Sequence, residues 1–156
     1  MRTKLTTIAA LAVAAVTLTA VASAGSTTAK QRVAIQVTES GFVLTPLTAG
    51  PIKSDTGRGS AVNFCCWTRR FITRNGQPIE INNPQMTLTG KHGTIVTRNV
   101  IGWIDVPDGY SLFTGTWKVI RATGAYAGLT GGGGAAGVSL PIGNTNAKFE
   151  GFLNPK

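Results

Sequence analysis

The sequence is poor in the residues that most often carry catalysis or bind metals. Its 156 residues include one histidine, two cysteines and six acidic residues. Cys65 and Cys66 are adjacent and His92 stands alone in a predicted turn, so no spacing typical of a transition-metal site is present. The glycine run 131–134 lacks a following Lys-Ser or Lys-Thr, and no Gly-x-Ser-x-Gly occurs, which excludes a phosphate loop and a nucleophile elbow. We therefore predict no metal and no cofactor.

Long hydrophobic runs are equally scarce, and the one present lies at the N-terminus. Arg2 and Lys4 precede an apolar run over residues 8–18, and Ala22-Ser23-Ala24 resembles a small-residue cleavage site. The run is too short to span a bilayer. We predict a secretory signal peptide over residues 1–24, a single secreted domain over residues 25–156, and no membrane span.

Acidic residues are outnumbered, and the chain carries a formal net charge of +9. Loss of Arg2 and Lys4 with the signal peptide leaves thirteen cations against six acids, a net charge of +7. Such a surface favours anionic partners such as cell-wall polymers, although a soluble protein with excess cations is the simpler interpretation. No basic stripe alternates with stacking aromatics, so we predict no nucleic-acid binding.

Alternating apolar residues predict many short strands and no helix of ten residues or more after residue 24. Asn75-Gly76 is a strong signal for a two-residue hairpin turn. A change of phase in a long strand predicts a bulge near Asn99. Residues 49–60 are predicted to form a loop, either alone or with an edge segment, and the glycine run 131–134 a flexible hairpin tip. The strands are predicted over residues 31–38, 41–47, 61–67, 71–73, 77–81, 85–89, 94–106, around Trp117, 135–140 and 147–153.

Many short strands with glycine-rich turns are typical of a sandwich or a closed barrel. Closure removes the sheet edges, which favours the barrel for a chain rich in Val, Ile and Thr. We predict an all-β, calycin-like fold: a single antiparallel up-and-down β-barrel of about eight strands. In this fold the segment 115–134 forms a strand followed by a corner at Thr123-Gly124.

Several segments also resemble a known family. They are the stretches 91–95 (KHGTI) and 101–105 (IGWID), the block GTWKVIRATGAYAGLTGGG from Gly115, and the ending 149–152 (FEGF). They are similar to secreted bacterial proteins of undefined function in the allene oxide cyclase barrel-like group, which is related to plant dirigent proteins and the calycins. The resemblance covers about residues 60–152. It implies an eight-stranded barrel with a cavity at one mouth, a hydrophobic small-molecule ligand and possible oligomers.

The residues that can serve a ligand site are mainly aromatic. Three tryptophans and Phe149 can line an interior, and one thiol of the adjacent cysteines can face it. The thiols can be free, joined in a strained ring or bonded between molecules. Asp105 and Glu150 are the candidate acid and base, although no spacing places them together. The predicted ligand-binding residues are Trp67, Trp103, Trp117, Cys65, Cys66 and Phe149.

Three functions follow, of which the first is preferred. The protein binds a small hydrophobic or aromatic molecule, or the same rings simply fill the core of a small barrel. Alternatively, the pocket steers a reactive intermediate as an isomerase or cyclase, or guides its stereochemistry by shape. A third hypothesis is an envelope-associated protein held by charge to an anionic cell-wall polymer.

Overall fold

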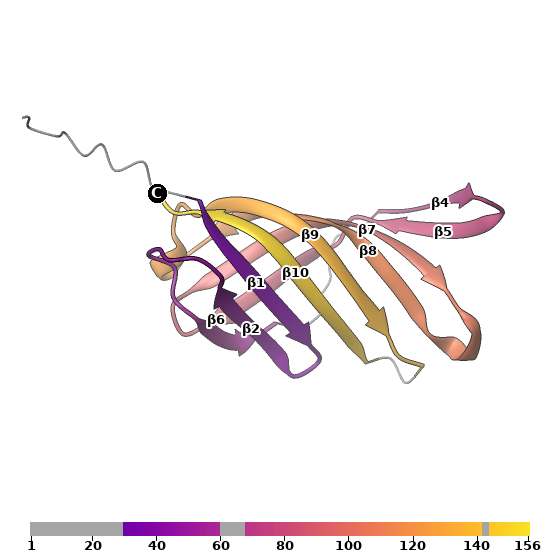
Figure 1. Cartoon of the computed structure of the whole chain (residues 1–156), viewed down its shortest axis with the longest axis horizontal. Helices are drawn as coiled ribbons and strands as arrows, with labels where there is room; N and C mark the ends of the chain where they lie inside the picture. Colours follow the sequence, from indigo (N-terminus) through magenta and orange to yellow (C-terminus); the bar gives the residue numbers. More distant parts are fainter. Residues whose placement is uncertain (1–29, 60–67, 142–143) are drawn as a thin grey trace, which may run out of the picture.

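The computed structural model describes residues 30–59, 68–141 and 144–156, and nearly all of this chain is β-strand (Figure 1). Its helical elements in these ranges are two 3-10 turns, η1 (Pro107–Gly109) and η2 (Gly124–Tyr126). The predicted signal peptide lies outside the described residues, as do the predicted strand 61–67 and its residues Cys65, Cys66 and Trp67.

Eight strands form a closed antiparallel barrel, which confirms the predicted fold. Going round the barrel, each strand pairs with the next, and β7 pairs with both β6 and β8 to complete the ring. The strands in this order are β1 (Gln31–Thr38), β2 (Gly41–Pro46), β3 (Asp55–Arg58), β6 (Gln85–Gly90), β7 (Thr94–Asp105), β8 (Ser111–Ala122), β9 (Thr130–Ser139) and β10 (Thr145–Asn154).

A hairpin inserted between β3 and β6 projects from the barrel, at the upper right of Figure 1. It consists of β4 (Arg69–Arg74) and β5 (Gln77–Asn82), joined by the predicted Asn75-Gly76 turn. Both turn residues have positive φ, 52° and 77°, as a type I′ turn requires. β5 pairs with the C-terminal half of β7, whereas β6 pairs with its N-terminal half.

A break at Pro84 separates β5 from β6 on the same side of β7. Proline has no N–H to donate to the ladder. Its carbonyl instead accepts hydrogen bonds from Asn99 of β7, from the backbone N at 2.9 Å and from Nδ2 at 3.2 Å. Asn99 is fully buried, so these bonds anchor the point where the hairpin leaves the barrel.

The barrel interior is filled with side chains. Alternate residues of β1 are buried, as expected for a strand with one face on the core. Trp117 and Phe149 pack within this core, edge to face, with ring centroids 6.4 Å apart. Full burial of one large apolar side chain contributes about 1.5–3 kcal/mol. The largest fully buried apolar side chains are Phe149, Ile35, Leu44, Met86, Leu88, Ile95, Ile101 and Leu153.

The glycine run forms the N-terminal half of β9, so the prediction of a flexible hairpin tip was wrong. These glycines pair with residues 150–153 of β10 on one side, and three of them pair with residues 116–118 of β8 on the other. A Cβ on Gly133 would lie 1.9 Å from the Glu150 carbonyl oxygen, so the neighbouring backbone occupies the space that a side chain needs. Low complexity here reflects close strand approach, not flexibility.

Two further predictions need correction. The predicted loop 49–60 contains β3, a barrel strand of four residues that pairs with β2 and β6. The predicted irregularity in β7 is present, but the register shift lies between Val96 and Thr97, two residues before Asn99. β3 was hard to predict because it has only four residues. The position of the shift in β7 was hard to predict because the buried polar residues Thr97 and Asn99 interrupt the apolar alternation.

Two buried polar side chains close one end of the barrel. Gln31 donates from Nε2 to the carbonyl oxygens of Thr48 and Ile52, both at 3.0 Å, and Oε1 accepts from the Ile52 N–H at 2.8 Å. These bonds hold loop 47–54 over the opening, where Ile52, Tyr126 and Leu129 are buried. We call this end the closed end.

Asp55 is the second fastening of the closed end. Its carboxylate accepts from the Tyr126 hydroxyl at 2.8 Å and from the backbone N–H groups of Thr56, Lys91 and His92 at 2.8, 3.0 and 3.2 Å. Burial alone would raise the pKa of Asp55, but these four hydrogen bonds outweigh it and hold the pKa below its usual 3.8. Asp55 therefore has a structural role, and it begins β3.

Replacement of Asp55 by Asn should destabilise the barrel by roughly 2–4 kcal/mol, because an amide NH2 would face donors in a buried site. Tyr126→Phe, which removes one hydrogen bond, should cost less. Urea unfolding measures both. Because the folded pKa is depressed, the contribution of Asp55 is complete above its unfolded pKa and is lost as pH falls through the folded value. The difference between wild type and Asp55→Asn should therefore shrink in acid, and a constant difference would contradict this account.

Candidate ligand site at the flared end of the barrel

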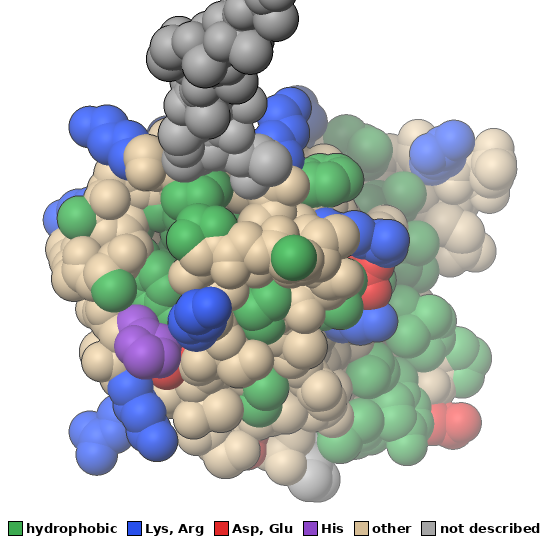
Figure 2. Space-filling model, turned by 60° about the vertical axis from the view of Figure 1, so that its left-hand side comes forward, with side chains coloured by type: hydrophobic (Ala, Val, Ile, Leu, Met, Phe, Trp, Pro, Cys, Tyr) green, Lys and Arg blue, Asp and Glu red, His purple; other side chains and the backbone are tan. Residues whose placement is uncertain are grey.

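The end of the barrel opposite the closed end is uneven because its strands differ in length. β7 and β8 have 12 residues each, whereas β3 has four and β6 six. The longer strands continue beyond the shorter ones, with the β4–β5 hairpin beside β7 (Figure 1). We call this the flared end. In Figure 2 the closed end faces the viewer, and hydrophobic side chains gather at the right of the picture.

The strand register shows which hairpin residues continue the interior surface. Asn82 lies opposite Ile101, a buried core residue, and Glu80 lies opposite Trp103. On β4, Arg69 pairs with Asn82, and Phe71 pairs with Glu80. Because alternate residues share a face, all these side chains belong to the inner face of the flared end.

Aromatic side chains form the apolar part of this face. Trp103 lies opposite Phe113 in the register, and their ring centroids are 4.3 Å apart. The next strand has Gly137 opposite Phe113, and a Cβ there would lie 2.2 Å from the Phe113 ring, so this position leaves room for the ring. Phe71 is 65% exposed. A hollow of about 120 Å³ is lined by Phe71, Gln77, Pro78, Glu80, Trp103 and Asp105.

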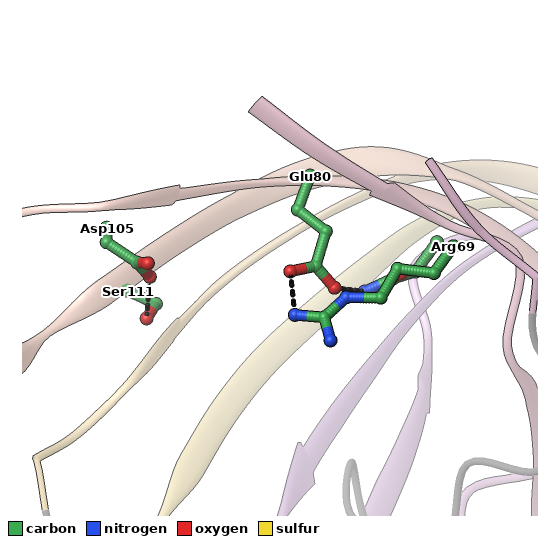
Figure 3. A network of polar contacts seen from close by, with 5 residues as sticks. Arg69, Glu80, Asp105 and Ser111 are labelled. Carbon is green, nitrogen blue, oxygen red and sulfur yellow. Dashed lines mark hydrogen bonds and ion pairs between the residues drawn. The ribbon is translucent and has the colours of Figure 1, made fainter. Parts of the chain in front are cut away.

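Polar side chains lie in two groups at this end of the barrel, Arg69 with Glu80 and Asp105 with Ser111 (Figure 3). Arg69 and Glu80 form an ion pair, and Asn82 donates from Nδ2 to Glu80 Oε1 at 2.9 Å. The Ser111 hydroxyl donates to Asp105 Oδ1 at 2.7 Å. The hydrogen bond from Arg69 is the main reason that the pKa of Glu80 lies below its usual range. Glu80 is therefore ionised at neutral pH.

Two buried polar atoms on this face have no hydrogen-bond partner within the described part of the chain. They are the indole nitrogen Nε1 of Trp103, which can only donate, and the amide oxygen Oδ1 of Asn82, which can only accept. A buried polar group without a partner typically lowers the stability of the folded protein by about 1–3 kcal/mol, so such groups are uncommon and often have a functional reason. A third such atom, Asn154 Oδ1, belongs to the last residue of β10, toward the closed end.

The structure separates the residues proposed from sequence. Trp103 lies on the inner face of the flared end. Trp117 and Phe149 are core residues, and Trp117 Nε1 donates to the Glu150 carbonyl oxygen at 3.3 Å. Cys65, Cys66 and Trp67 lie outside the described residues.

The candidate acid and base are not brought together. Asp105 is the last residue of β7 at the flared end. Glu150 lies on the outer wall, where its carboxylate pairs with Lys148 at 2.6 Å and Arg32 at 3.6 Å. His92 is exposed beside the closed end, in the turn where it was predicted, and is visible in Figure 2 as the single histidine.

Sequence reasoning missed Arg69, Phe71, Glu80 and Asn82. A signal for them was present, because a two-residue turn at Asn75-Gly76 makes Arg74 pair with Gln77 and so sets every later pair of the hairpin. The missing step was the pairing of this hairpin with β7, since nothing in the sequence marks that contact.

Comparisons with protein-family models, with curated proteins and with solved structures find no match for this chain. Over residues 30–59, 68–141 and 144–156, no helix has the length and apolar character needed to cross a membrane.

The ion pair of Arg69 with Glu80 joins β4 to β5 and should stabilise the base of the hairpin. Glu80→Gln should lower the local stability of the hairpin by roughly 1 kcal/mol, the upper end for a pair with one exposed partner. Amide hydrogen exchange in residues 69–82 should then be about fivefold faster, with the barrel strands unchanged. Arg70→Gln is the matched control, because Arg70 lies on the other face of β4.

The same pair should respond to pH. The depressed pKa of Glu80 means that the pair stabilises the hairpin fully above its usual 4.5 and weakens as pH falls through the folded value. Exchange in wild type should therefore approach that of Glu80→Gln in acid. Equal exchange in the two proteins at neutral pH would show that the pair does not hold the hairpin.

Proposed function

We propose that this protein binds a small aromatic or hydrophobic molecule that carries oxygen substituents, at the inner face of the flared end. The observation that supports this most directly is the pair of unpartnered buried atoms, Trp103 Nε1 and Asn82 Oδ1. Trp103 lines the hollow, so an acceptor on a bound ring would satisfy its Nε1, and a donor reaching toward the core would satisfy Asn82 Oδ1, which lies opposite Ile101. The ring of the ligand would rest against the aromatic side chains. Apolar walls with a few placed polar groups are typical of small-molecule sites.

The size of the hollow favours a single ring. It measures about 120 Å³ and is open on one side. An engineered apolar cavity of about 150 Å³ holds benzene. Trp117 and Phe149 are buried in the core, so the ligand rests beyond them at the flared end.

Binding is favoured over proton-transfer chemistry because the nearby carboxylates are already engaged. Glu80 is held by Arg69 and Asn82, and Asp105 accepts from Ser111. A general base needs a free lone pair directed at the substrate and a pKa near the working pH. The depressed pKa of Glu80 is unsuited to that role.

A matched pair of probes tests the proposal. 4-Hydroxybenzaldehyde carries an acceptor and a donor on one ring, whereas p-xylene has a similar shape and neither group. Isothermal titration calorimetry should show binding of 4-hydroxybenzaldehyde, weakened about tenfold in Trp103→Phe, which removes one hydrogen bond to a buried donor. Any binding of p-xylene should be unaffected by this change.

Trp117→Phe is the control, because it makes the same substitution in the core. It should lower the melting temperature and leave the affinity for 4-hydroxybenzaldehyde unchanged. If Trp103→Phe binds the probe as tightly as wild type, or if wild type binds neither probe, the proposed site is wrong.

We also propose that residues 1–24 direct secretion, on the basis of their charged start, apolar run and small-residue end. Expression in a bacterial host should place the protein outside the cytoplasm with Gly25 as its first residue, as Edman sequencing or intact mass measures. Recovery from the cytoplasm with Met1 retained would contradict the proposal.

A further inference from the structure

A second hollow lies on the outer wall of the barrel, where the β4–β5 hairpin joins it. Its volume is about 500 Å³. One wall is formed by neighbouring residues of β7 and β8, and the other by the residues just before β4 and just after β5. The hollow is lined by Thr68, Asn83, Arg98, Val100, Thr116, Trp117 and Lys118.

Two cations face each other in this hollow. Arg98 of β7 lies directly opposite Lys118 of β8 in the register, and both are exposed. Side chains of directly opposed residues are neighbours on the sheet surface, and like charges in that position are destabilising. A negative charge placed near both cations would reduce this repulsion.

No carboxylate of the chain supplies that charge. All six acidic residues lie in the described ranges, and neither cation takes part in an ion pair. Each acid has a place elsewhere: Glu39 beside Asn144, Asp55 with Tyr126, Glu80 with Arg69, Asp105 with Ser111, Asp108 in the turn η1, and Glu150 with Lys148 and Arg32.

The remaining lining groups are mostly donors. Asn83 donates from Nδ2 to Thr68 Oγ1 at 3.0 Å, which leaves the Thr68 hydroxyl hydrogen free to donate outward. Thr116 adds a second hydroxyl on the same face as Lys118. Val100, 47% exposed, gives an apolar surface beside these groups. A guanidinium, an ammonium and two hydroxyls around one space match a ligand rich in acceptors and negative charge.

We propose that this hollow binds a tetrahedral oxyanion, the phosphate or sulfate group of a small organic molecule. Arg98 and Lys118 contact the anion, Thr68 and Thr116 donate to its remaining oxygens, and Val100 contacts the organic part. The volume exceeds what a free ion needs, which favours an organic ester. The site is distinct from the one proposed above, since Arg98 and Val100 lie on the outer face of β7 and Trp103 on its inner face.

The test uses glycerol 3-phosphate, inorganic phosphate and inorganic sulfate as probes, with isothermal titration calorimetry on the folded protein. We expect glycerol 3-phosphate to bind and to raise the melting temperature. Arg98→Gln and Lys118→Gln should each weaken this binding about tenfold, the loss of one charge-assisted hydrogen bond. Both positions are exposed, so the variants should fold, as far-UV circular dichroism verifies.

Arg121→Gln is the matched control. It removes one exposed cation from the same strand as Lys118 but does not line the hollow. Tighter binding of glycerol 3-phosphate than of the inorganic ions supports an organic ester, whereas equal binding identifies the ligand as the free anion. Absence of binding by all three probes would overturn the proposal, as would equal weakening by Arg121→Gln, which would indicate only a general attraction of anions.

The same variants give a second readout without ligand. If Arg98 and Lys118 repel each other, neutralising either should raise the melting temperature slightly at low salt, and added salt should reduce the gain. Phosphate should raise the melting temperature of wild type more than that of either variant. A wild-type protein that is stabilised no more than Lys118→Gln would contradict a site at this pair.

Discussion

The rest of the structure depends on the pairing of β1 with β10, which brings the two ends of the described chain together. Seven residue pairs, from Gln31 with Leu153 to Val37 with Ala147, join them. This contact, with the pairing of β7 and β8, closes the ring and leaves the eight barrel strands without a free edge. It also separates an inner from an outer face, because alternate residues of each strand point to opposite sides. Both proposed sites follow from that separation.

Unequal strand lengths make the two ends of the barrel different. At the closed end, Gln31 and Asp55 satisfy the groups around them and fasten loops over the opening. At the flared end, β7 continues beyond the end of β6, and β5 pairs with this C-terminal part of β7. The break at Pro84 thus produces two features at once: an inner face with aromatic residues above the core, and an outer hollow at the joint.

The fold could be predicted because its evidence is local. Period-two alternation in β1 and the Asn75-Gly76 turn each specify structure within a few residues. The glycine run misled because the reason for these glycines lies in other strands: the backbone of β10 approaches too closely for a side chain at Gly133. No pattern within β9 contains that information.

The candidate site was harder to predict for the same reason. Trp103, Trp117 and Phe149 have equal claims in the sequence, since each is an aromatic residue of a predicted strand. Only the position of each along its strand separates them, and that depends on the register of the whole barrel. Trp117 falls at the level of the filled core, whereas Trp103 falls beyond it beside the hairpin.

The shortage of acidic residues connects composition to function. With six carboxylates among fifteen cations, most cations must lack an internal partner. Where such cations are scattered, water solvates each of them at little cost. Arg98 and Lys118 differ because the register holds them side by side in a hollow with further donors. The repulsion between these two cations costs stability in the free protein. A bound anion would remove that repulsion and add new contacts, so both effects would contribute to the free energy of binding.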